Sequence, residues 1–186
     1  MLHIITKWED IIENQPYNDL SPFLIRAREH AGRLCRKYNL SEDKEEKEKL
    51  KRELLKSCGK NVIIEPDFKC EFGCNILIGN EVYINFDCII LDCMPVTIGN
   101  NVLFGPRVGI YTANHSFDPM ERKAGICIAK PITIEDNVWI GGDVKIVGGV
   151  TIGQNTVIGT GSVVTKDIPA NVVAVGNPCR IIKNIV

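Results

Sequence analysis

Aliphatic residues recur at every sixth position of the chain between residues 134 and 169. The six blocks of this stretch each open with isoleucine or valine: Ile134, Ile140, Ile146, Ile152, Ile158 and Val164. An α-helix cannot keep a period of six, because it repeats about every 3.6 residues. Short strands joined by tight turns can keep it, with aliphatic residues in the core and Gly or Asn where a turn needs positive φ. The period therefore predicts a parallel β-helix built of hexapeptide repeats.

The same phase continues toward the N-terminus. Further blocks open at Ile98 and Phe104, at Ile78 and Ile84, and more loosely at Ile64 and Cys70. One interruption, at residues 111–131, separates them from the regular stretch. We therefore expect residues 58–186 to form the β-helix, with a loop at 111–131 and an apolar C-terminal tail at 181–186 that packs back on the coil.

Residues 1–57 have the spacing of helices instead. We expect a short helix at 7–13, a helix at 23–38 that follows an N-cap at Ser21 and Pro22 and ends at Asn39, and a charged helix from an N-cap at Ser41 to about residue 57. In the second helix Ala31 and Cys35 belong to the apolar face, and Arg28 is assigned to the charged side. Because the open end of a β-helix must be covered, residues 1–57 are predicted to be an α-helical cap.

Composition excludes several classes of protein. The net charge is −1 and no Lys/Arg block resembles a binding stripe, so nucleic acid is not an expected partner. No apolar run approaches the roughly 18 residues of a membrane span, and the first residues lack the apolar region of a secretory signal.

The eight cysteines contain no C-x-x-C pair. Cys70, Cys74 and Cys88 fall at inward positions of the repeat, where a free thiol behaves as a small hydrophobic group. Buried, reduced cysteines are favoured over a metal site or disulfides, and such usage fits a reducing cytoplasm.

The interruption at 111–131 is the first candidate for a functional segment. A repeat protein usually ejects a long loop from one coil to build a site. This loop holds the only histidine of the coil region, His115. At neutral pH an imidazole can take a proton from a hydroxyl or an amine, so His115 is a candidate general base. A loop histidine without a function is the alternative.

Five motifs carry a family resemblance. They are Tyr83-Ile-Asn85-Phe-Asp, Tyr111-Thr-Ala-Asn-His115-Ser-Phe-Asp-Pro-Met-Glu-Arg, Lys130-Pro-Ile-Thr-Ile-Glu-Asp-Asn-Val-Trp139-Ile-Gly-Gly, Val164-Thr-Lys-Asp-Ile-Pro and Gly176-Asn-Pro-Cys-Arg180. Together they resemble the maltose/galactoside O-acetyltransferases over essentially the whole chain. The resemblance implies a left-handed β-helix, although the general rule for parallel strands predicts right-handed connections. It also implies a homotrimer with its active sites between subunits, acetyl-CoA as donor, and no required metal.

The resemblance also implies roles for single residues. His115 would be the general base for direct attack of an acceptor hydroxyl on the thioester, so no cysteine nucleophile is needed. Asn85 would bind the acceptor or position His115, unless it is only a turn residue. Tyr83 and Asp19 are weaker acceptor-site candidates. Asp92 is a nearby carboxylate that could equally be a turn residue.

The expected cofactor residues lie toward the C-terminal end. Small residues would let the pantetheine amides approach the coil, and basic residues would bind the phosphates of CoA. The positions that match are Gly142, Thr160, Thr165, Lys166, Arg180 and Lys183.

Four positions depart from the family pattern. Gly142 removes a hydroxyl and Lys183 replaces an arginine, both on the cofactor side. The family often has serine where Glu71 stands and aspartate where Cys93 stands. Because both are acceptor-site positions, the acceptor is left open: a sugar, a glycan precursor or another hydroxyl compound.

Three other functions compete with sugar acetylation. An acetyltransferase of the same fold acting on an antibiotic or an amine would use His115 in the same way. A non-catalytic β-helix assembly module would explain the repeat but not the loop histidine. A zinc enzyme of the γ-carbonic-anhydrase kind needs three converging histidines, and the chain has only His3, His30 and His115.

Overall fold

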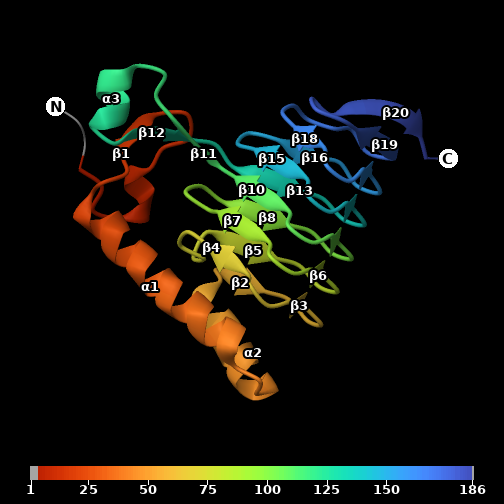
Figure 1. The fold of residues 1–186 in the computed structure, drawn as a ribbon, viewed down its shortest axis with the longest axis horizontal. Helices are drawn as coiled ribbons and strands as arrows, with labels where there is room; N and C mark the ends of the chain where they lie inside the picture. Colours follow the sequence, from red (N-terminus) through yellow and green to blue (C-terminus); the bar gives the residue numbers. More distant parts are fainter. Residues whose placement is uncertain (1–3, 186) are drawn as a thin grey trace.

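The hexapeptide repeats fold into a coil with three flat faces (Figure 1). The computed structural model describes residues 4–185. The first face contains β2 (Ser57–Cys58), β5 (Ile76–Ile78), β8 (Val96–Ile98), β13 (Ile132–Ile134) and β16 (Thr151–Ile152). The second contains β3 (Ile63–Ile64), β6 (Tyr83–Ile84), β9 (Leu103–Phe104), β14 (Trp139–Ile140), β17 (Val157–Ile158), β19 (Val172–Val175) and β20 (Arg180–Asn184). The third contains β4 (Lys69–Cys70), β7 (Ile89–Leu91), β10 (Gly109–Tyr111), β15 (Lys145–Val147) and β18 (Val163–Val164).

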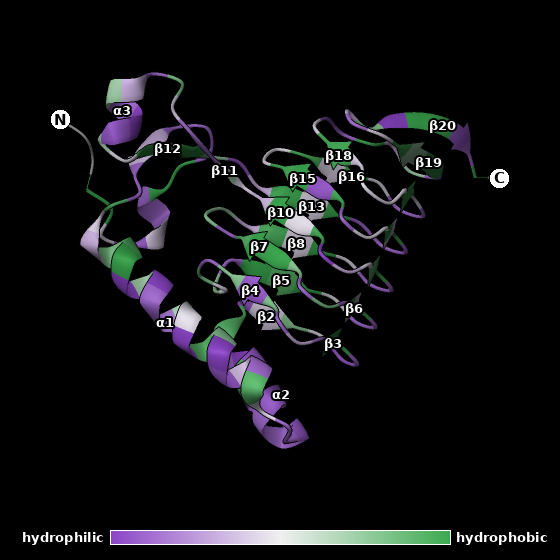
Figure 2. Ribbon diagram, in the orientation of Figure 1, coloured by the Kyte–Doolittle hydropathy of each residue, from purple (hydrophilic) through white to green (hydrophobic). Residues whose placement is uncertain are grey.

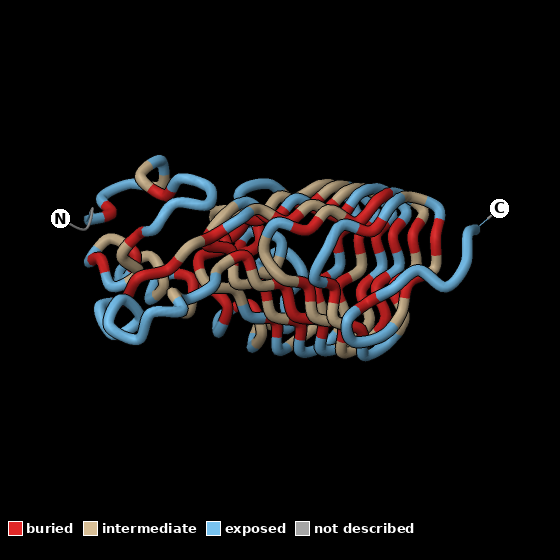
Figure 3. Tube along the Cα trace, turned by 90° about the horizontal axis from the view of Figure 1, so that it is seen from above, coloured by how far each residue is buried: buried red, intermediate tan, exposed pale blue. Residues whose placement is uncertain are grey.

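Apart from β20, the strands of each face are parallel and in register, so equivalent residues of successive turns stack. On the second face Ile84 pairs with Phe104, Phe104 with Ile140, and Ile140 with Ile158. The residues that open the six regular blocks are all 0% exposed. Figure 3 shows the buried residues repeating from turn to turn along the coil. The fold class predicted from the period, a parallel β-helix preceded by helices, is confirmed.

The corner between the first and second faces carries a column of asparagines. Asn101, Asn137 and Asn155 all have φ between 55° and 59°, a region that asparagine tolerates better than most residues. The Asn101 Nδ2 donates to Asn137 Oδ1 at 3.2 Å, and the Asn137 Nδ2 donates to Asn155 Oδ1 at 3.0 Å. The repeated asparagine therefore has two roles, one in the turn and one in linking successive turns.

The N-terminal segment differs in detail from the expected helices. The helix expected at 7–13 is only a 3₁₀ turn, η1 (Trp8–Asp10). The next helix, α1 (Pro22–Leu40), has the predicted N-cap Ser21 but continues past Asn39. The third, α2 (Lys44–Leu54), is capped by Asp43 and not by Ser41, because the Asp43 side chain accepts from Glu46 N at 2.8 Å.

The two long helices pack on the first turns of the coil (Figure 1). Leu34 and Tyr38 of α1 join the main core together with Leu50 of α2. The Tyr38 hydroxyl donates to Ile64 O at 2.6 Å and so attaches α1 to the second face. Figure 2 shows mainly hydrophilic residues along α2, in contrast to the apolar strands.

One charged residue of α2, Lys51, is buried. Lys51 is only 4% exposed; its Nζ donates to Val62 O at 2.6 Å and pairs with Glu48 Oε1 at 2.6 Å. We expect Lys51→Met to lower the free energy of unfolding by about 1–3 kcal/mol, because Val62 O loses its donor. Thermal unfolding followed by circular dichroism measures this. Lys49→Met, at an exposed position of the same helix, is the control; equal melting temperatures for the two variants would contradict the prediction.

The C-terminal tail packs back on the coil as expected. β20 pairs antiparallel with β19 at the edge of the second face. Val186, the last residue of the predicted tail, lies outside the described residues. Within residues 4–185 no helix is long and apolar enough to cross a membrane.

The interruption of the repeat builds a second, smaller sheet. Its chain forms β11 (Ala113–His115), α3 (Pro119–Lys123) and β12 (Ile126–Ala129). β12 lies between β11 and β1 (Pro16–Asn18), and both pairings are antiparallel. Beneath this sheet is a separate apolar cluster that includes Tyr17, Leu24, Phe72 and Cys127. The N-terminal segment thus does more than cover the coil, because it supplies a strand beside the loop.

Candidate active site

His115 is the last residue of β11, and its side chain is exposed at the surface. Its cross-strand partner on β12 is Cys127, which is 3% exposed. The Cys127 Sγ lies 3.2 Å from His115 Nδ1. The ring is therefore held at one nitrogen by a buried group, while His115 remains accessible from outside.

A small hollow of about 120 Å³ opens beside His115. Its lining comes from β1 and its following turn, the corner after β4, the end of β7, and the hairpin β11–β12. The lining residues are Tyr17, Asp19, Glu71, Leu91, Cys93, Ala113, Asn114, His115 and Cys127. Four residues predicted from sequence meet here: Asp19, Glu71, Cys93 and His115.

Arg28 forms ion pairs with both carboxylates of the hollow, Asp19 and Glu71. Its Nη2 donates to Asp19 Oδ1 at 2.8 Å, and Nε and Nη2 donate to Glu71 Oε1 at 3.0 and 2.8 Å. The guanidinium lies 5.3 Å from the centre of the Phe72 ring. Sequence reasoning missed this residue by assigning it to the charged side of α1. Its spacing of three and seven residues from Ala31 and Cys35 was the signal, since these positions share one helix face.

The two departures from the family pattern on the acceptor side, Glu71 and Cys93, lie against each other. The Cys93 thiol donates to Glu71 Oε2 at 3.0 Å, and Glu71 Oε1 accepts from Arg28. The carboxylate expected at position 93 is thus replaced by one at position 71 in the same hollow. Burial, followed by the negative charge of Glu71, raises the pKa of the Cys93 thiol. At neutral pH Cys93 is a thiol and a hydrogen-bond donor.

Asp92 does not reach the hollow. It is 0% exposed, and its carboxylate accepts from Phe72 N at 2.8 Å and from Asn75 N at 3.2 Å. Burial raises its pKa, and bonds from backbone amides partly offset the effect. Of the two roles considered for Asp92, its contacts favour the turn residue over the acceptor contact.

Asn85 and Tyr83 lie at another corner of the coil. The Tyr83 hydroxyl donates to Glu65 Oε1 at 3.1 Å, and Asn85 Oδ1 accepts from Phe86 N at 2.9 Å. Tyr83 is the first residue of β6, and Asn85 follows β6 in the turn that leaves the second face. Neither lines the hollow beside His115 of the same chain.

The six expected cofactor residues also divide between different parts of the coil. Gly142 and Thr160 follow β14 and β17 at the corner where Asn85 lies, and Gly161 N donates to Gly142 O at 2.9 Å. A Cβ at position 142 would lie 3.3 Å from Pro106 O. Glycine therefore leaves no side chain projecting from the coil at this corner. Thr165 and Lys166 are exposed after β18, at the corner from which the loop leaves; Arg180 and Lys183 are exposed on β20.

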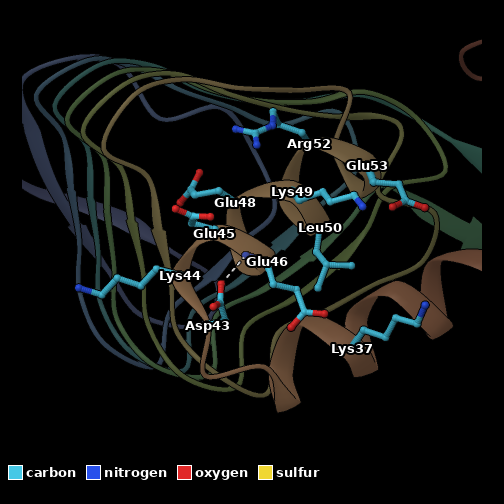
Figure 4. A pocket seen from close by; sticks show the side chains of 10 residues that line it. All are labelled: Lys37, Asp43, Lys44, Glu45, Glu46, Glu48, Lys49, Leu50, Arg52 and Glu53. Atoms are coloured by element: carbon cyan, nitrogen blue, oxygen red, sulfur yellow. Dashed lines mark hydrogen bonds between the residues drawn. The ribbon is translucent and has the colours of Figure 1, made fainter.

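A wider hollow of about 970 Å³ lies between α1 and α2 (Figure 4). Charged side chains of both signs line it, including Lys37, Glu46 and Arg52. It contains neither the loop nor a histidine. Among residues 4–185 no group of three or more His, Cys, Asp or Glu side chains is placed to hold a metal ion. His30 lies on α1 away from the hairpin of His115, and His3 lies outside the described residues.

Three family models match parts of the chain. Residues 131–166 match the bacterial transferase hexapeptide (six repeats), residues 95–112 the hexapeptide repeat of succinyl-transferase, and residues 11–59 the maltose acetyltransferase hexapeptide capping motif. A putative acetyltransferase of Saccharomyces cerevisiae is 48% identical over 95% of this chain and 92% of its own length. A solved maltose O-acetyltransferase of Clostridium difficile 630 superposes with a TM-score of 0.94 at 45% identity, over 99% of this chain and 100% of that one. The chain belongs to the maltose/galactoside O-acetyltransferase family.

A further solved member of this family is a galactoside acetyltransferase in complex with coenzyme A. It superposes with a TM-score of 0.89 at 43% identity and covers 93% of this chain and 88% of its own. The two likenesses extend over both the helices and the coil. The family assignment therefore applies to the whole chain and not only to the repeat.

Proposed function

We propose that this family member transfers the acetyl group of acetyl-CoA to a hydroxyl of a sugar, with His115 as general base. The observation that carries the proposal is the hollow in which His115 lies beside Asp19 and Glu71. A base next to two carboxylates suits an acceptor with several hydroxyls, because carboxylate oxygens accept hydrogen bonds from them. Relatives with maltose and galactoside in their names support the same acceptor class.

The proposed reaction is a single displacement. The imidazole takes the proton of the acceptor hydroxyl while its oxygen attacks the thioester carbonyl carbon. The C–O bond forms, the C–S bond breaks, and the proton passes from the imidazolium to the sulfur of the leaving CoA. Burial raises the pKa of Cys127 to about 11, so this thiol is protonated at neutral pH and is not a ready nucleophile. A cysteine acyl-enzyme is not needed.

We infer further that the site is completed by a second copy of the chain in a homotrimer. Asn85, Gly142 and Thr160 lie at one corner of the coil, whereas His115 and Lys166 belong to another. In a symmetric ring each interface joins two different surfaces of the chain. We infer that the corner with Asn85 in one copy faces the corner with His115 in its neighbour. Light scattering is expected to give the mass of three chains; a monomer with full activity would contradict the inference.

The test of the proposed function is CoA release from acetyl-CoA with a panel of acceptors. The panel contains sugars, nucleotide sugars, hydroxyl-bearing antibiotics and amines. A sugar as the best acceptor supports the proposal, and an antibiotic or amine would overturn its acceptor class. Acetyl-CoA that neither binds nor reacts would favour a non-catalytic module. We place the enzyme in the cytoplasm, since all eight cysteines are free thiols.

A further inference from the structure

His115 has a close partner that none of the family motifs includes. Cys127 and His115 are directly opposite each other on β12 and β11, and Tyr17 is the partner of Cys127 on β1. Directly paired residues of antiparallel strands have their side chains on the same face of the sheet. The three side chains thus form a row along the hollow, in which the Cys127 sulfur lies 3.2 Å from His115 Nδ1.

The chemistry of an imidazole makes this contact important. A neutral ring carries one N–H, and the hydrogen bond made at one nitrogen decides whether the other holds a proton. Nδ1 faces the buried Cys127, so Nε2 is the nitrogen left to act on a substrate. Nε2 can accept a proton only when the hydrogen of the neutral ring is on Nδ1, and that hydrogen then needs an acceptor.

Cys127 meets the requirements for that acceptor. It is 3% exposed, and burial raises its pKa to about 11, so its sulfur is uncharged at neutral pH. A thioether or thiol sulfur accepts hydrogen bonds weakly. Within residues 4–185 His115 Nδ1 is the one hydrogen-bond partner found for the Cys127 sulfur.

The charged groups that face this pair come from three elements. Asp19 follows β1, Glu71 follows β4, and Arg28 belongs to α1; all three act on Cys127. Two carboxylates and one guanidinium leave a net negative charge near His115. The Cys127 sulfur is uncharged, so it orients the imidazole ring of His115 and adds no charge of its own.

We propose that Cys127 is the positioning residue of His115, with its sulfur accepting the Nδ1 hydrogen and so leaving Nε2 unprotonated. The proposal rests on the proposed function of His115 as general base. In this proposal Cys127 acts through His115 and takes no part in the bonds that form and break. Its effect on the rate comes through the orientation and the tautomer of the imidazole ring.

The first test is the tautomer of His115, measured by ¹⁵N NMR of protein labelled at histidine. The chain has only three histidines, so assignment with His30→Ala and His115→Ala is direct. In the wild type we expect the hydrogen on Nδ1. Cys127→Ala should shift the ring toward the tautomer with hydrogen on Nε2, and Cys127→Ser should retain the wild-type tautomer, because a hydroxyl oxygen also accepts an N–H.

The second test is turnover of the same variants. We expect kcat to fall about tenfold in Cys127→Ala, with KM for acetyl-CoA unchanged and most of the rate restored in Cys127→Ser. Melting temperatures of both variants control for misfolding in the apolar cluster.

Either of two results overturns the proposal. One is a wild-type ring with hydrogen on Nε2, which would mean that the thiol donates to Nδ1. The other is a Cys127→Ala protein with the wild-type tautomer and the wild-type rate. Because the NMR measurement does not use turnover, it tests whether Cys127 sets the His115 tautomer even if the acceptor is misassigned. Full activity of His115→Ala would instead overturn the proposed function.

Discussion

The His115→Ala variant is expected to lose at least about 100-fold in kcat for acetyl transfer, because a positioned general base contributes about 10²–10⁴-fold. Its fold should be unaffected, since the His115 side chain is exposed and the change of stability at such positions is within about 0.5 kcal/mol. CoA release at saturating acetyl-CoA measures the loss.

The matched control for this variant is His30→Ala. His30 is the other histidine within residues 4–185, and it is exposed on α1. The control is expected to keep the wild-type rate. Equal turnover in His115→Ala and the wild type would remove His115 from the mechanism. A fall in both variants would point to a general effect of histidine removal and not to the site.

Arg28→Met is expected to lower kcat/KM for the acceptor by about 100-fold, the order of loss caused by a misplacement of about 1 Å in an active site. Arg28 is the cation that holds Asp19 and Glu71 in place at 2.8 Å. Without it, two negative carboxylates share a small hollow and repel each other. Steady-state kinetics with the best acceptor of the panel measures this. KM for acetyl-CoA should change little, because the expected cofactor residues lie elsewhere on the coil.

Two further variants define what Arg28 does. Arg28→Lys keeps the charge but loses the forked donors, so it should recover only part of kcat/KM. Arg33→Met removes an exposed arginine from the same helix and is expected to behave as the wild type. If Arg33→Met and Arg28→Met lose the same activity, the ion pairs of Arg28 with Asp19 and Glu71 are not what supports the acceptor.

Nearly all of the coil could be predicted because the repeat is local. A residue such as Ile140 stacks on Phe104 and Ile158, and each of them occupies the same place in its own hexapeptide. The core position, the turn and the parallel pairing then follow from one period. The N-cap of α2 was predicted wrongly because two nearby residues gave equivalent local signals. Ser41 and Asp43 are both good N-cap residues, and the end of α1 at Leu40 decided between them.

The site could be predicted only in part, because it depends on pairings between distant segments. The loop position and residue type of His115 made it the candidate base, and the structure places it beside the hollow. The register that places Cys127 opposite His115 depends on the pairing of β11 with β12, which no repeat encodes. Arg28 was missed because an arginine on a helix is usually solvated. Asn85 is separated from His115 within one chain, so their expected cooperation requires a neighbouring copy.

The strand β1 has a consequence for how the molecule is made. Pro16, Tyr17 and Asn18 leave the ribosome early, but they pair with residues 126–128, which follow after about half of the coil. Domains fold as they are synthesised, and contacts between distant segments form late. The first turns of the coil can therefore fold while the candidate active site is still incomplete. Acetyl transfer should begin only after β12 has been synthesised and has paired with β1.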